Sequence, residues 1–126
     1  MKYTYSCSVS SDITSVCDTV KKIVSDLGDK LSYEKLMDVR LVLSELMING
    51  CEHGNDNDRN KKVSIDVEAD DEAVSIKVSD EGDGFDYRRD VKIDEFSCSG
   101  RGLMIVSRLC EQVQVEKSTV SCIIRL

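Results

Sequence analysis

The chain has 126 residues, of which 40% are hydrophobic and 33% charged, and its net charge is -7. This length and composition are typical of one globular domain, covering residues 1–126, that needs no disulfide or metal to fold. The acidic balance argues against binding to nucleic acid. Because the sequence shows neither an apolar run of about 20 residues nor a signal peptide, we expect a cytoplasmic protein without a membrane span.

The cysteine pattern gives no sign of a metal or redox site. No two of the six cysteines form a C-x-x-C pair, and the chain has a single histidine, so neither a zinc site nor a thioredoxin-like motif is indicated. We expect the cysteines to be small buried hydrophobic residues. Cys98, which falls in a polar loop, is the expected exception.

The first 28 residues predict a strand and then a helix. Tyr3, Tyr5 and Cys7 alternate with polar residues, as in a half-buried strand at the edge of a sheet. Ser11 or Asp12 is then followed by apolar residues spaced as in an amphipathic helix of about four turns, with Gly28 as its end. These apolar residues are Ile13, Val16, Val20, Ile23 and Leu27.

A second helix is predicted from its N-cap Ser32 to Gly54, where a glycine can adopt the left-handed conformation that closes helices. Glu45, Asn49 and His53 are spaced at i, i+4 and i+8, so they share one face. That face presents a carboxylate, a carboxamide and an imidazole together, which points to a ligand. The opposite side is apolar and consists of Leu36, Val39, Leu43, Leu46 and Met47.

The rest of the chain predicts two hairpins and a third helix. Residues 55–62 are expected to form a solvated loop without further function. Alternating apolar residues in 63–67 and 74–78 predict an antiparallel hairpin, and those in 113–117 and 120–126 predict another. Between them, a glycine-rich turn opens a helix with apolar positions Leu103, Val106, Leu109, Cys110 and Val113. Helices grouped against a mostly antiparallel sheet make an α/β (α+β) two-layer sandwich.

Three polar or glycine-rich motifs carry the chemistry, although each alone has a structural explanation as a solvated face, a turn or a flexible loop. Gly100 and Gly102 allow backbone N–H groups to approach an anion at a helix start, where Arg101 adds charge. The pattern is neither a Walker A loop nor a dinucleotide fingerprint. Asn49 offers an oxygen to Mg²⁺, and Asp80 offers an acceptor for an exocyclic amine. Together the three motifs point to Mg-ATP.

The order and spacing of these motifs resemble the N, G1 and G2 boxes of the GHKL ATPase superfamily. The matching stretches are Glu45 to Asn55 (ELMINGCEHGN), Asp80 to Asp86 (DEGDGFD) and Ser99 to Leu103 (SGRGL). Within the superfamily the chain is most similar to the bacterial anti-sigma factor serine kinases. The resemblance implies the Bergerat ATP-binding fold, a mostly antiparallel mixed sheet covered on one face by three helices.

The resemblance also implies roles for individual residues. Glu45 would be the general base and Asn49 the Mg²⁺ ligand, Asp80 would bind the adenine amino group, and His53 would pack the helix end or lie near the phosphates. The remaining residues are glycine-box positions: Gly82 and Gly84 would shape the base pocket, and Gly100, Arg101, Gly102 and Leu103 would hold phosphates. The implied substrate is a serine of a small anti-anti-sigma (STAS-type) protein, and the implied competing partner of the homodimeric kinase is a sigma factor.

Departures from the family pattern leave other functions open. Histidine kinases carry a basic residue where this chain has Glu52, which argues against that activity. The lid segment 87–99 is short and contains no threonine, and the last hairpin is expected to place Ser121 or Cys122 where the family has Gly-Thr near the adenine. The alternatives are therefore a nucleotide-dependent binding module without phosphotransfer and a relative that no longer binds ATP.

Overall fold

The structure is a computed structural model that describes residues 1–82 and 98–126, with the backbone alone for residues 98–103. The described parts form five strands, three α-helices and one π-helical turn. Their order is β1 (Lys2–Ser10), α1 (Ile13–Leu27), α2 (Tyr33–Asn49), η1 (Gly50–Gly54), β2 (Lys62–Asp70), β3 (Ala73–Ser79), α3 (Cys98–Leu109), β4 (Gln112–Glu116) and β5 (Thr119–Arg125).

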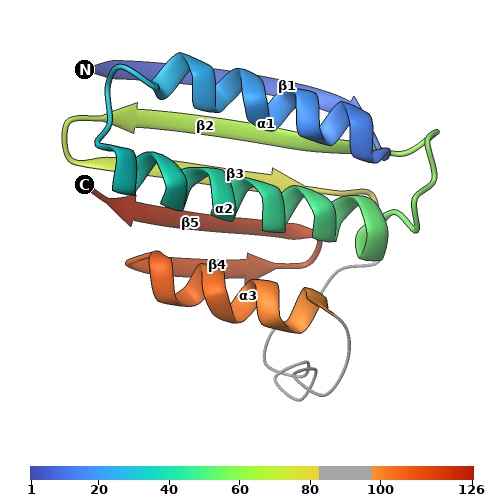
Figure 1. Cartoon of the computed structure of the whole chain (residues 1–126). Coiled ribbons are helices and arrows are strands. Elements are labelled where there is room, and N and C mark those ends of the chain that lie inside the picture. Colours follow the sequence, from blue (N-terminus) through green and yellow to red (C-terminus); the bar gives the residue numbers. More distant parts are fainter. Residues whose placement is uncertain (83–97) are drawn as a thin grey trace.

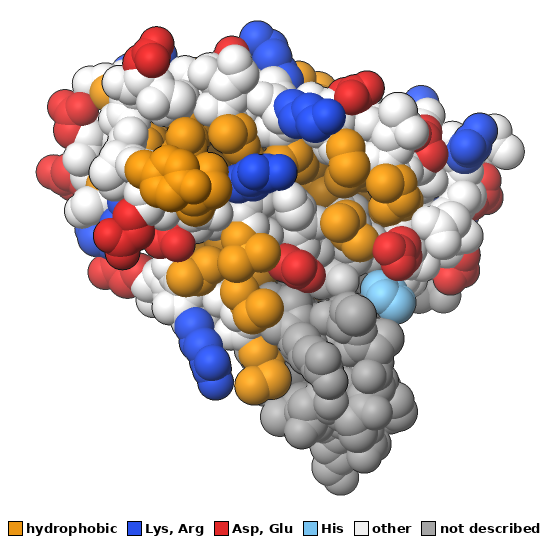
Figure 2. Space-filling view, in the orientation of Figure 1, with side chains coloured by type: hydrophobic (Ala, Val, Ile, Leu, Met, Phe, Trp, Pro, Cys, Tyr) orange, Lys and Arg blue, Asp and Glu red, His pale blue; other side chains and the backbone are white. Residues whose placement is uncertain are grey.

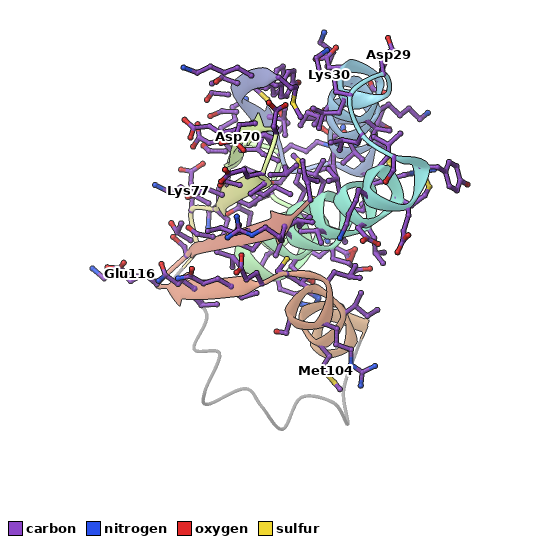
Figure 3. All side chains as sticks on the ribbon, turned by 90° about the vertical axis from the view of Figure 1, so that its left-hand side faces the viewer. Asp29, Lys30, Asp70, Lys77, Met104 and Glu116 are labelled. Carbon is purple, nitrogen blue, oxygen red and sulfur yellow. The ribbon has the colours of Figure 1, made fainter. Side chains whose placement is uncertain are left out.

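The strands form one sheet in the order β1-β2-β3-β5-β4, and the helices lie on one of its faces (Figure 1). In the perpendicular view the three helices stand on one side, while Asp70, Lys77 and Glu116 lie on the other (Figure 3). The predicted two-layer α+β sandwich and the edge position of β1 are thereby confirmed. All described pairings are antiparallel, so the sheet is more uniform than the mixed sheet that the resemblance implied.

The core lies between the sheet and the helices and follows from the two periodicities. Every second residue of β2 and β3 is buried, and so is one side of α1 and of α2. Full burial of such a side chain stabilises the fold by about 1.5–3 kcal/mol. The predicted core positions of α2 are confirmed, with Leu36 at the margin and Val39, Leu43, Leu46 and Met47 buried. In α1, Val16, Val20, Ile23 and Leu27 are buried, whereas Ile13 is exposed.

Side-chain caps fix the starts of the first two helices. Asp12, one of the two predicted residues, caps α1 by accepting a 2.8 Å hydrogen bond from the Ser15 N–H. Ser11 is instead buried and donates its hydroxyl hydrogen to the Lys61 carbonyl. Ser32 caps α2 as predicted, accepting from the Lys35 N–H at 3.2 Å.

The end of α2 differs from the prediction in its geometry. The helix widens into the π turn η1, in which the Asn55 N–H donates to the Gly50 carbonyl at 2.9 Å. Gly54 is the last residue of this turn but does not adopt the left-handed conformation. Two later residues, Asp56 and Asn57, do so with φ angles of 52° and 58°. The widened turn satisfies the backbone and removes the need for a left-handed glycine.

The cysteines largely follow the prediction. Cys51, Cys110 and Cys122 are buried, but Cys17 is exposed because it lies on the outer side of α1. Cys98 begins α3, and its side chain lies outside the described atoms. In the parts of the chain that the structure describes, no helix is both long and apolar enough to span a bilayer.

Candidate functional site

The end of α2 and the end of β3 meet at one edge of the molecule (Figure 1). Asp80 directly follows β3, and a Cβ atom built on Gly50 would lie 3.6 Å from the Cβ of Asp80. The first two predicted motifs, about 30 residues apart in the chain, are therefore in direct contact. This contact arises because α2 packs over the sheet and runs in the same direction as β3, so both elements end on the same side of the molecule (Figure 1).

Asp80 is a half-buried carboxylate fixed at both its side chain and its backbone. Its Oδ1 atom accepts a 2.8 Å hydrogen bond from the Gly82 N–H, and its own N–H donates to the Ser118 carbonyl at 3.0 Å. Burial raises the pKa of this carboxyl group, and the Gly82 N–H and the charge of Lys61 offset only part of the effect. A carboxylate held in this way can accept a hydrogen bond from a ligand amine.

Two glycines are required for this close approach. A Cβ atom on Gly54 would lie 2.5 Å from Asp80 Oδ1 and still closer to Oδ2, whereas real Cβ atoms essentially never come within 3.0 Å of another heavy atom. A Cβ atom on Gly82 would lie 2.8 Å from the Gly54 carbonyl carbon. Backbone therefore contacts backbone and carboxylate directly here, with no space for a side chain.

Asn49 occupies the last position of α2 and is half-buried. Its Nδ2 atom is buried and has no hydrogen-bond partner, which distinguishes it from every other buried side-chain nitrogen and oxygen in the described residues. A buried donor without an acceptor costs about 1–3 kcal/mol. A bound anion such as a phosphate would supply that acceptor if its binding uncovers the Nδ2 atom, and the carboxamide oxygen of Asn49 would be available to a cation.

The donor set also fits Mg²⁺ rather than a protein-caged metal. In the described part of the chain, no three His, Cys, Asp or Glu side chains converge on a possible metal position. Mg²⁺ usually takes one or two protein ligands and completes its shell with waters and phosphate oxygens. Asn49 would therefore hold such an ion together with bound phosphates, not in a closed protein site.

Glu45 and His53 flank Asn49 in the chain, one helical turn before and after it. Glu45 is half-buried on α2, and His53 is exposed on η1. Figure 2 shows this histidine in pale blue at the surface of the helical face. The three side chains thus include a half-buried carboxylate, a half-buried amide and an exposed imidazole, and their common face stays a prediction because His53 belongs to the π turn.

The third motif lies at the beginning of α3. The helix begins at Cys98, so Gly100 and Gly102 lie within its first turns. The prediction had placed them in a turn that precedes the helix. The free backbone N–H groups of a first turn are nevertheless the groups that bind anions. The side chains of Arg101 and Leu103 lie outside the described atoms, and so do Gly84 and the lid segment 87–97 entirely.

Two structural roles near Asp80 escaped the sequence analysis. Asn55, expected in a solvated loop, is wholly buried and bonded to three segments of the chain. A polar residue in a polar, turn-rich segment gives no sequence signal of burial.

The residue of the last hairpin that lies beside Asp80 is also different from the one predicted. Thr119 pairs with Ser79, and their hydroxyl groups are 2.9 Å apart. Ser121 and Cys122 instead pair with residues two and three positions further from Asp80. The tight turn before Thr119, with Lys117 at a φ of 54°, sets this register. Counting back from that turn would have found Thr119.

Comparison of the sequence with known proteins gives a family match and several named relatives. Residues 10–126 match the family model described as the histidine kinase-like ATPase domain. The chain is 27% identical over 108 residues to serine-protein kinase RsbW of Bacillus subtilis (strain 168). The matching region covers 78% of this chain and 66% of that protein. It is also 27% identical over 103 residues to the anti-sigma F factor of Shouchella clausii (strain KSM-K16), which covers 77% and 69%. The chain thus spans slightly less than two thirds of the length of the RsbW relative.

Proposed function

The chain belongs to the family of histidine kinase-like ATPase domains, and we propose that it is an ATP-dependent protein serine kinase that also acts as an anti-sigma factor. We propose that it binds Mg-ATP, phosphorylates a serine of a small anti-anti-sigma (STAS-type) protein and sequesters a sigma factor as a homodimer. The names of the relatives, serine-protein kinase and anti-sigma F factor, support this assignment. Its single-domain extent, residues 1–126, remains a prediction.

The observation that carries the proposal is the direct contact between the end of α2 and the Asp80 loop. Asn49 with its unpaired buried donor and Asp80 with its fixed acceptor belong to adjoining backbone segments. A nucleotide needs this combination, because its base carries hydrogen-bonding edges and its phosphates carry charge. Asn49 directly precedes Gly50, whose added Cβ would lie 3.6 Å from the Asp80 Cβ, so both groups belong to the same part of the molecule.

On the base side, Asp80 would accept a hydrogen bond from the adenine amino group. Gly82 would hold the carboxylate through its N–H, and Gly54 would leave the space that the carboxylate occupies. Guanine carries a carbonyl oxygen where adenine carries the amine, so a fixed acceptor disfavours it. We therefore propose a preference for ATP over GTP.

On the phosphate side, Asn49 would donate from Nδ2 to a phosphate oxygen and offer Oδ1 to Mg²⁺. The free N–H groups in the first turn of α3, which contains Gly100 and Arg101, would bind phosphate oxygens, and we assign Gly102 and Leu103 of the next turn to the same phosphate-binding segment. When bound, Mg²⁺ supplies positive charge that offsets the developing charge on the phosphates. His53, exposed on η1, would lie near the phosphates at the border of the nucleotide site.

For phosphotransfer, Glu45 would act as the general base. It would accept the proton of the substrate serine hydroxyl as that oxygen forms its bond to the γ-phosphorus and the bond to the bridging oxygen of ADP breaks. Glu45 lies one helical turn before Asn49, so both side chains project from the same face of α2. The position of Glu45 relative to Asn49 supports this role.

The test is phosphate transfer from Mg-ATP to the purified anti-anti-sigma partner. We expect Glu45→Gln to bind ATP normally and to lose at least about 100-fold in transfer rate, the usual contribution of a general base. Glu34→Gln removes the same charge from the exposed first turn of α2 and should transfer phosphate at the wild-type rate. Full activity of Glu45→Gln would refute its assignment as the base.

The same assay separates the alternative function. A protein that binds ATP and changes its affinity for a sigma factor with nucleotide, yet transfers no phosphate, would be a nucleotide-dependent binding module. The short lid segment without threonine favours this alternative. Calorimetry with Mg-ATP decides the third case, since a chain that has lost nucleotide binding gives no heat of binding. Light scattering would test the proposed homodimer.

A further inference from the structure

We propose that Asn55 is a positioning residue of the nucleotide site, which holds the loop 80–82 against Gly54 and so fixes the direction of the carboxylate that reads the base. This inference rests on the proposed nucleotide binding. It gives a role to Asn55, the last residue of the first motif, which so far has none. Asn55 is 0% exposed and would not contact the nucleotide itself. Its effect would pass through Asp80.

The side chain of Asn55 uses every hydrogen-bonding group that it has. One Nδ2 hydrogen is donated to Ser11 Oγ at 2.8 Å and another to the Lys62 carbonyl at 2.9 Å. The Oδ1 atom accepts from the Glu81 N–H at 2.8 Å. The carboxamide thus joins the start of α1, the start of β2 and the loop after β3.

The bond to Glu81 is the one that matters for the site. Glu81 lies between Asp80 and Gly82, so Asn55 holds the middle of the loop whose ends carry the carboxylate and its N–H donor. Asn55 also directly follows Gly54, the residue that the carboxylate contacts. One side chain therefore fixes the distance between the two sides of this contact.

Asn55 is further fixed by its own backbone. Its N–H donates to the Gly50 carbonyl at 2.9 Å, and its carbonyl accepts from the Asp58 N–H at 2.9 Å. The Glu81 carboxylate in turn accepts from the Lys62 N–H, a second link between the loop and β2. A buried, fully bonded amide is stiff, so the loop follows the position of η1. Movement of the α2 end would shift Asp80 as well.

The experiment compares two alanine variants of the same network. Asn55→Ala removes the hydrogen bond from the Glu81 N–H. Ser11→Ala removes the acceptor of one Asn55 Nδ2 hydrogen and leaves the bond to Glu81 in place. Both variants lose buried hydrogen bonds, so both should unfold more easily. Affinities for Mg-ATP and Mg-GTP are measured by calorimetry in a buffer containing an osmolyte, with the folded fraction determined separately.

We expect the ratio of ATP to GTP affinity to fall about tenfold or more in Asn55→Ala and to stay at the wild-type value in Ser11→Ala. Phosphate and Mg²⁺ contacts are common to both nucleotides, so this ratio reports the base contact and not general stability. If Asn55→Ala does not fold, Asn55→Ser replaces it, because its shorter side chain does not span the distance to Glu81.

A readout without nucleotide accompanies the binding assay. In Asn55→Ala the freed loop exposes Asp80 to water, so its pKa, followed by carboxyl carbon NMR, should fall toward the ordinary value. An unchanged affinity ratio in Asn55→Ala would overturn the proposal and leave nucleotide binding intact. Failure of the wild-type chain to bind ATP, or to prefer it to GTP, would instead overturn the proposed function and this role with it.

Discussion

Replacing Gly54 by alanine should weaken nucleotide binding while leaving the fold in place. The new Cβ atom would lie 2.5 Å from Asp80 Oδ1 and closer still to Oδ2. The carboxylate therefore has to retreat by nearly 1 Å before both oxygens reach the 3.0 Å that real Cβ atoms keep. Asp80 is a short side chain held by the Gly82 N–H, so retreat breaks or bends that hydrogen bond.

The energetic consequences follow from this displacement. Overpacking costs about 1–3 kcal/mol, and weakening a hydrogen bond to a charged group costs about 1.5–3 kcal/mol. Because strain is relieved when the bond breaks, these costs overlap, and we expect the free energy of unfolding to fall by about 2–3 kcal/mol. A misdirected acceptor for the base should weaken Mg-ATP binding at least tenfold, which corresponds to about 1.4 kcal/mol.

Gly50→Ala is the matched control. Its Cβ atom would lie 3.4 Å from Val63 Cγ1 and 3.6 Å from the Asp80 Cβ, which are ordinary or nearly ordinary contacts. Alanine is favoured over glycine in a helix by about 0.5–1 kcal/mol, so this variant should be as stable as the wild type or more so. Urea unfolding and Mg-ATP calorimetry measure both variants. Equal ATP affinity of Gly54→Ala and Gly50→Ala would refute the role assigned to the close contact.

Three further changes test separate parts of the structure. Burial raises the pKa of Asp80, so the native state binds its proton more tightly than the unfolded chain and the stability from this group falls as pH rises above 3.8. Asp80→Asn removes this loss, so the variant should gain stability over the wild type as pH rises from 3.8 through the raised pKa of Asp80, measured by urea midpoints, and the gain should level off above that pKa. The variant should also no longer prefer ATP. A stability difference that does not change with pH above 3.8 would contradict the reasoning. Asn49→Leu removes the unpaired buried donor, so it should keep or raise the thermal midpoint while calorimetry detects no Mg²⁺-dependent ATP binding. Asp12→Ala removes the cap of α1 and should cost about 1 kcal/mol in urea unfolding, with ATP affinity unchanged.

The periodic parts of the fold were predictable because burial alone dictates them. Alternation in β2 and β3 and helical spacing in α1 and α2 place apolar residues on one side, and the structure buries those residues. The cap Ser32 was predictable because its oxygen meets a local need of the helix start. The widened turn η1 was not, because its hydrogen bonds depend on a tertiary fit against Asp80 and not on local preference.

The candidate site was predictable only as a set of motifs. Glycine and acidic residues such as those in 80–86 also occur in ordinary turns. Only their order in the chain relative to Asn49 indicated a nucleotide site. Asn55 could not be recognised, since its burial results from three segments that meet only in the folded chain. Thr119 was missed because a hairpin read by composition alone leaves its register open, whereas pairing with Ser79 fixes it.

The two halves of the site rest on different physical constraints, so binding and transfer are separable in this fold. The proposed base side depends on contacts at Gly54 that admit no side chain, so a change there should weaken nucleotide binding. The proposed transfer side depends on Glu45, a half-buried residue of α2. Under the proposed mechanism, loss of this carboxylate would stop phosphate transfer and leave a nucleotide-dependent binding module. Retention of Gly54 and Asp80 consequently argues for nucleotide binding, and only the phosphotransfer assay distinguishes the two functions.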